Sequence, residues 1–105
     1  MARNEQIADA LNRVVDIFEK KPEMALDTNL TTSVLEDGLK CTVRQGDHTA
    51  VVDMVEIMGG ENAGPSPGFF GRAALISCIA IGLKMAAAIA GVQLDKICVD
   101  VEMDW

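Results

Sequence analysis

The chain has 105 residues, the size of a single domain, and its formal net charge is −7. It contains no run of Lys and Arg, and phosphate contacts need clustered basic side chains, so we expect no nucleic-acid partner. One histidine and three widely spaced cysteines give no metal-ligand spacing, and we expect neither a metal nor a cofactor.

The cysteines, Cys41, Cys78 and Cys98, are an odd number without a Cys-x-x-Cys pair, which is typical of free thiols in a reducing compartment. The N-terminus has an amphipathic pattern where a signal peptide needs a basic segment followed by an apolar run. We therefore expect a cytoplasmic protein. Only three Phe and one Trp are present, so the core must be built from small aliphatic side chains.

Residues 4–21 are predicted to form an amphipathic helix with a single apolar stripe. Asn4 suits the N-cap, Lys20 and Lys21 suit the negative end of the helix dipole, and Pro22 ends the helix. The stripe consists of Ile7, Leu11, Val14, Val15 and Phe18. The helix either covers a core or serves as an arm that packs on a partner subunit.

Residues 30–57 are predicted to form an antiparallel meander of strands. The Asp37-Gly38 pair is typical of a two-residue hairpin turn between the first two strands. A second turn is expected at residues 45–48, and residues 49–57 follow as the third strand.

The middle strand of this meander alternates apolar and polar residues, so one of its faces meets the core. Cys41 belongs to that apolar face and is expected to be a small core residue. Arg44 lies on the other face. His48 is interpreted as a solvated turn residue.

Residues 58–66 form a loop rich in Gly and Pro, and a long helix follows at 66–90. Ser66 suits its N-cap, Pro67 its first position, and Gly91 its C-terminal stop. Its longest apolar run ends before Lys84 and is shorter than the roughly 20 residues that span a bilayer. We expect a buried helix rather than a membrane span, and covering it needs a second subunit.

Residues 95–105 alternate strictly and are predicted to be a fourth strand with an acidic outer face. Cys98 lies on that outer face. The chain is thus expected to be one α+β domain, 1–105, with a helix at 4–21, strands within 30–57, a central helix at 66–90 and a strand at 95–105.

The stretch GGENAGPSPG, which begins at Gly59, is followed by AALISC, which ends at Cys78, and by GVQL, which begins at Gly91. In these features, and from about Leu30 to the end, the chain resembles the OsmC/Ohr family of peroxide and osmotic stress proteins. The resemblance implies an intertwined α+β homodimer, in which two long central helices pack between antiparallel sheets and each active site uses both chains.

The resemblance also implies site residues. Cys78 matches the peroxidatic cysteine of the active family members, and Arg44 is the nearest match to the arginine that activates it. Gly68 stands where the reductases carry a glutamate, so Glu61 in the preceding loop is the candidate substitute. The family continues beyond Trp105 with a resolving cysteine, so we expect either a piece of a longer protein or a shortened member.

Two functions follow as expectations. In the first, Cys78 reduces an organic hydroperoxide and is restored by an external thiol reductant. A thiol is mostly protonated at neutral pH, so this activity needs a nearby cation such as Arg44. An apolar wall favours a small apolar hydroperoxide, and it consists of Phe69, Phe70, Ile81 and Met85. In the second, the chain is an inactive binding or structural module in which Cys78 packs in the core.

Overall fold

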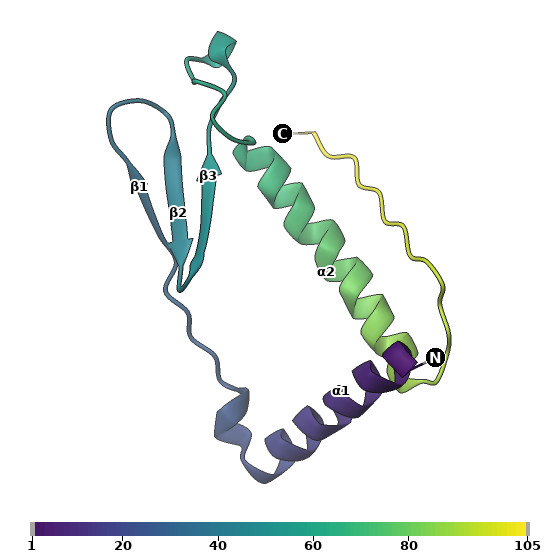
Figure 1. Ribbon diagram of the computed structural model, residues 1–105. Coiled ribbons are helices and arrows are strands. Elements are labelled where there is room, and N and C mark those ends of the chain that lie inside the picture. Colours follow the sequence, from purple (N-terminus) through teal and green to yellow (C-terminus); the bar gives the residue numbers. More distant parts are fainter. Residues whose placement is uncertain (1, 105) are drawn as a thin grey trace. The chain divides into compact units, whose positions relative to one another are not determined.

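The computed structural model describes residues 2–104, and its architecture is α+β: one antiparallel sheet and two long helices (Figure 1). Residue contacts divide the described chain into two compact units. One lies within Met1–Asp27 and Ala74–Trp105, and the other is Thr28–Ala73.

The sheet contains β1 (Thr32–Leu35), β2 (Cys41–Gln45) and β3 (His48–Val52) in the order β1-β2-β3. The antiparallel meander is therefore confirmed. Directly opposite residues share a face of a sheet. The Cys41 face consists of Ser33, Leu35, Cys41, Val43, Gln45, His48, Ala50 and Val52, and the Arg44 face consists of Thr32, Val34, Thr42, Arg44, Thr49 and Val51.

The turn between β2 and β3 is confirmed. Gln45 pairs with His48, and Gly46 supplies a positive φ of 58°. The two-residue turn predicted at Asp37-Gly38 is wrong, because Leu35 pairs with Cys41 and leaves residues 36–40 as a longer connection. The third strand ends at Val52 instead of continuing to residue 57, and Glu56–Met58 form a short 3-10 helix.

Helix α1 spans Ala2–Lys20 and ends before Pro22, as predicted. Asn4 is not the N-cap, because the helix has already begun at Ala2. The Asn4 side chain is buried, and its Oδ1 has no hydrogen-bond partner. The apolar stripe is only partly covered, with Val15 half exposed.

Helix α2 spans Pro67–Ile89, close to the predicted range. Its end is a Schellman motif. The N–H of Gly91 donates to the carbonyl of Ala88 and the N–H of Val92 to that of Ala87, while Gly91 has a φ of 74°. Gly91 is thus the stop that its position in the sequence predicts.

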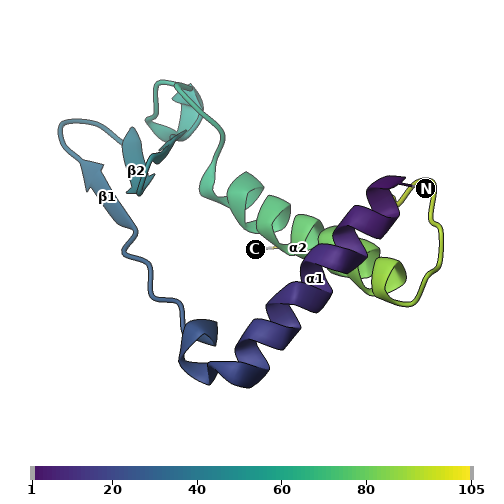
Figure 2. The same cartoon turned by 60° about the horizontal axis from the view of Figure 1, so that its bottom comes forward.

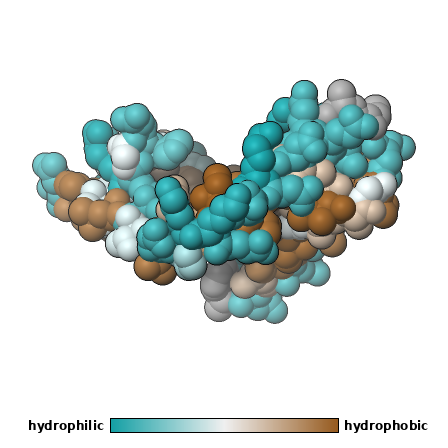
Figure 3. Space-filling view, turned by 90° about the horizontal axis from the view of Figure 1, so that it is seen from below, coloured by the Kyte–Doolittle hydropathy of each residue, from teal (hydrophilic) through white to brown (hydrophobic). Residues whose placement is uncertain are grey.

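The long helix is not buried within the single chain, and the prediction assigned its cover to a second subunit. Ala88 is its only buried residue among those described, and several of its large apolar side chains are about half exposed. These are Phe69, Leu75, Ile79, Ile81, Leu83 and Ile89. Figure 3 shows apolar side chains, in brown, uncovered at the surface. By length and composition alone α2 could also cross a membrane.

Residues 95–104 do not form the predicted fourth strand. They run back in an extended conformation alongside the part of α2 that belongs to the same compact unit, from Ala74 onward (Figures 1 and 2). Lys84 of α2 holds the start of this segment, because its Nζ donates to the carbonyl oxygen of Leu94 at 2.7 Å. A strand needs a neighbouring strand for its backbone groups, and this unit supplies only helices.

Candidate functional site

The loop between β3 and α2 is organised by one buried carboxylate. Asp53 follows directly after β3 and is only 2% exposed. Its carboxylate accepts backbone hydrogen bonds from Met54 at 2.7 Å, Glu61 at 3.2 Å and Ala63 at 3.1 Å. The N–H of Met54 does most to hold the pKa of Asp53 below its usual value. Burial opposes this, while the other two N–H groups and the charge of Lys40 support it.

Two glycines let the loop approach the chain closely. A Cβ at Gly60 would collide with the carbonyl of Met54 and lie 2.9 Å from the Asp53 carboxylate. A Cβ at Gly64 would collide with the carbonyl of Val51. Asn62 has a left-handed φ of 55°, and its N–H donates to the Met54 carbonyl at 3.0 Å. The Gly-rich composition of this loop therefore reflects close backbone packing.

The same loop sets the start of α2. The N–H of Asp53 donates to the carbonyl of Pro65 at 3.1 Å. Ser66 then caps the helix, since its Oγ accepts the N–H of Phe69 at 3.3 Å. This cap confirms the predicted helix start. The role of Asp53 was not predicted, although an acidic residue in the apolar run Val52-Asp53-Met54 was a usable signal.

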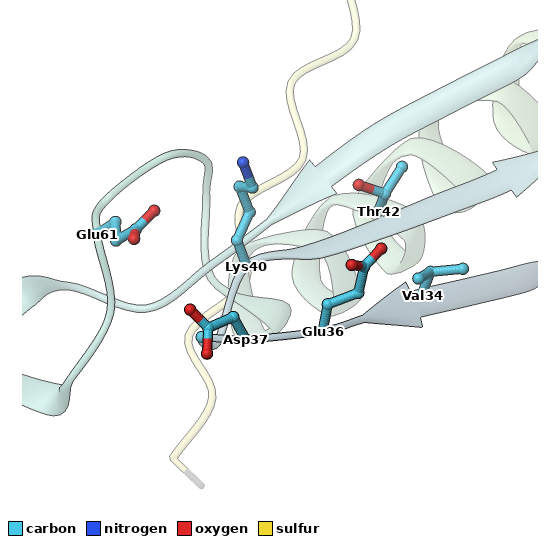
Figure 4. A pocket seen from close by; sticks show the side chains of 7 residues that line it. Val34, Glu36, Asp37, Lys40, Thr42 and Glu61 are labelled. Atoms are coloured by element: carbon cyan, nitrogen blue, oxygen red, sulfur yellow. The ribbon is translucent and has the colours of Figure 1, made fainter.

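A polar cavity of about 450 Å³ lies beside the loop (Figure 4). It is lined by Val34, Glu36, Asp37, Gly38, Lys40, Thr42 and Glu61. Figure 4 shows Glu61 on one side and Glu36 and Asp37 on the other, with Lys40 between them. Glu61 is thus placed next to Lys40 and not beside Arg44, which does not line the cavity.

Arg44 lies on β2, exposed, opposite Thr32 and Thr49. Within residues 2–104, no ion pair connects Arg44 with Glu61. The two predicted partners therefore belong to the same compact unit but are not joined. His48 is exposed at the start of β3, and Cys41 is half-buried on the Cys41 face.

Cys78 is exposed on α2. Ile81 and Met85 follow it by three and seven residues, so at about 100° per residue they share its side of the helix. Ile81 also lines a small hollow of about 260 Å³ against residues 94–97. Phe69 precedes Cys78 by nine residues and therefore points to the opposite side, where its ring packs edge-on against Phe70 at 5.4 Å.

The predicted site residues thus fall into two groups. Cys78, Ile81 and Met85 lie in one compact unit, whereas Arg44 and Glu61 lie in the other. Cys98 is exposed on the extended segment. Among the residues that the structure describes, no cluster of three or more His, Cys, Asp or Glu side chains could hold a metal ion.

In comparisons with known proteins, no family model, no curated protein and no solved structure matches the chain.

Proposed function

We propose that the chain is an OsmC-like homodimer that reduces small organic hydroperoxides through Cys78. The observation that carries the proposal is the exposed thiol of Cys78 on an apolar side of α2, next to Ile81 and Met85. A thiol in that position is accessible to a peroxide whose organic part contacts the neighbouring apolar side chains.

The reaction has two halves. The Cys78 thiolate attacks one peroxide oxygen, the O–O bond breaks, and the leaving alkoxide takes up a proton to become the alcohol. The sulfur is left as sulfenic acid. An external dithiol then forms a mixed disulfide with Cys78, which releases water, and its second thiol restores Cys78 and leaves the dithiol oxidised. Arg44, from either chain, is the cation we propose to favour the thiolate.

The accessible surface supports a second subunit. Large apolar side chains stand exposed along α2, among them Leu75, Ile79 and Leu83. Exposed apolar surface of this kind is typical of a protein interface. The exposed apolar residues of α2 are the natural site of that interface.

A bilayer is the other apolar medium that could cover α2. Residues 95–104 run alongside this helix in an extended conformation and have no strand partner among the described residues. Backbone that is neither helical nor part of a closed barrel is very costly in lipid. A protein partner in the cytoplasm, where free thiols stay reduced, is therefore the better explanation.

The experiment treats the purified protein with one equivalent of cumene hydroperoxide and follows each cysteine by mass spectrometry. We expect sulfenic acid at Cys78 first, with Cys41 and Cys98 slower. The Cys78→Ser variant should consume no peroxide in the presence of dithiothreitol, and Arg44→Gln should slow the oxidation at least tenfold. Equal or slower oxidation at Cys78 would refute the proposal.

A second candidate is an inactive binding or structural module of the same fold. It is favoured by Gly68 at the position of the family's glutamate and by the absence of an ion pair between Arg44 and Glu61 in the described chain. In that case Cys78→Ser leaves dimerisation unchanged and the wild-type protein does not react with peroxides.

A further inference from the structure

The polar cavity beside the β3–α2 loop is lined by charged side chains of both signs (Figure 4). They are Glu36, Asp37, Lys40 and Glu61. Within residues 2–104, no ion pair joins Lys40 to any of the three carboxylates. The whole lining belongs to the compact unit Thr28–Ala73, so the cavity is formed by one unit of one chain. Its charged groups can therefore pair with those of a bound molecule.

The backbone holds the walls of this cavity in place. Glu36 follows the last residue of β1, and Lys40 precedes the first residue of β2. Glu61 is held by the loop, because its N–H donates to the buried carboxylate of Asp53 at 3.2 Å. A site whose groups are already positioned loses less conformational freedom when a ligand binds.

The arrangement of the charges limits the kind of ligand. Figure 4 shows Glu61 on one side, Glu36 and Asp37 on the other, and Lys40 between them. Among the described residues no group of three or more acidic side chains could hold one metal ion, so a compact divalent cation does not fit. A simple diamine would meet both acidic sides but leave Lys40 as an uncompensated like charge. The pattern favours a ligand with two cationic groups and one carboxylate.

The size and exposure of the cavity favour the same kind of molecule. Its volume of about 450 Å³ lies within the usual range of small-molecule sites, about 300–1,000 Å³. Val34 contributes an apolar wall that can contact methylene groups. The four charged side chains are exposed, so a single ion pair with any of them contributes little. A ligand therefore binds only if it meets several of these charges at once.

We infer that this cavity binds a free basic amino acid of the lysine type. The α-ammonium group of the ligand lies against Glu36 and Asp37, its carboxylate against Lys40, and the cationic end of its side chain against Glu61. Every charge of the ligand then faces an opposite charge of the cavity. The inference goes beyond the proposed function and depends neither on the chemistry of Cys78 nor on a second copy.

The experiment measures binding to the full chain by isothermal titration calorimetry at low ionic strength. The probes are L-lysine and three analogues that each lack one of its charges. 1,5-Diaminopentane lacks the carboxylate, 6-aminohexanoate lacks the α-ammonium group, and L-norleucine lacks the side-chain ammonium group. We expect L-lysine to bind about fivefold or more tightly than each analogue, and added salt to weaken its binding.

Two variants assign the charges of the ligand to the walls of the cavity. Lys40→Gln should weaken the binding of L-lysine but not that of 1,5-diaminopentane, which has no carboxylate. Glu61→Gln should weaken the binding of L-lysine but not that of L-norleucine, which has no cationic side chain. Glu56→Gln is the matched control, because Glu56 is exposed, lies outside the cavity lining and gives the same change of net charge. It should bind L-lysine as the wild type does.

Amide resonances of the wild-type protein give an independent readout of the same binding. L-lysine should shift those of residues 34–42 and 60–62 most strongly. The inference is overturned if L-lysine does not bind at millimolar concentration, if an analogue binds as tightly, if Glu56→Gln weakens binding as much as Glu61→Gln, or if the largest shifts lie elsewhere. None of these results bears on the oxidation of Cys78, which has its own test.

Discussion

Asp53 and Pro65 are joined by a hydrogen bond of 3.1 Å from the N–H of Asp53 to the carbonyl of Pro65, which ties the end of β3 to the start of α2. The carboxylate of Asp53 meanwhile accepts the N–H groups of Glu61 and Ala63 from the intervening loop. One residue therefore fixes both ends of this loop, and with them the place of Glu61 at the cavity.

Replacing Asp53 should loosen the loop. Asp53→Ala removes the carboxylate that accepts hydrogen bonds from the N–H groups of Met54, Glu61 and Ala63. These three donors then lose their acceptor, so we expect a clear fall in the melting temperature. Asp53→Asn keeps one acceptor oxygen and should cost less. Asp47→Asn, at an exposed turn, is the control. Equal melting temperatures for Asp53→Ala and Asp47→Asn would contradict the role of the carboxylate.

Acid should remove the contribution of Asp53. Its pKa in the folded chain lies below the ordinary 3.8, so between the two values the unfolded chain binds more protons. The stabilisation is complete above the ordinary value and is lost as the pH falls through the folded value. Urea midpoints of the wild type and Asp53→Asn should therefore differ at neutral pH and converge as the pH falls through the lowered pKa of Asp53. A difference that stays constant over this range would contradict the assignment.

Gly60→Ala and Gly64→Ala should both destabilise the fold, because each Cβ would collide with a backbone carbonyl. Overpacking of this kind costs about 1–3 kcal/mol. Gly38→Ala is the matched control, because nothing lies within 4 Å of its Cβ position and its φ is not positive. Chemical denaturation of the three variants checks the difference, and a neutral Gly60→Ala would show that the loop can move away.

Local signals predicted the ends of α2 well. Ser66, Pro67 and Gly91 act through bonds within a few residues, so the sequence near them is sufficient. The length of the β1–β2 connection is not local. A two-residue turn at Asp37-Gly38 would place Leu35 opposite Lys40, whereas the actual register places it opposite Cys41. Burial of one face of the whole sheet decides the register.

The site depends on longer-range information still. The burial of Asp53 results from a loop that returns from residues 61–65, which no periodicity reveals. The alternation of residues 95–104 was predicted and is seen in their burial, but a strand exists only with a partner. The position of Arg44 relative to Cys78 likewise depends on how compact units and copies assemble, which the residues alone do not determine.

Ser66→Ala should weaken the start of α2, because the Oγ of Ser66 is the acceptor for the N–H of Phe69. Loss of such an N-cap costs about 1 kcal/mol. Ser77→Ala is the control within the same helix. The Ser77 hydroxyl bonds to the Ala74 carbonyl and is exposed, so its removal should be neutral or slightly stabilising. Thermal unfolding by circular dichroism checks both, and an equal loss in the two variants would contradict the cap.

Lys84 should determine how firmly the C-terminal segment is held, because its ammonium group donates to the carbonyl of Leu94 at 2.7 Å. Hydrogen bonds to charged groups contribute about 1.5–3 kcal/mol. Lys84→Met keeps the apolar stem and removes the donor, so residues 95–104 should exchange their amide hydrogens faster while the sheet is unaffected. Lys20→Met, which removes an exposed ion pair with Asp16, should leave the exchange of this segment unchanged. Unchanged amide exchange of residues 95–104 in Lys84→Met would contradict this role of the ammonium group.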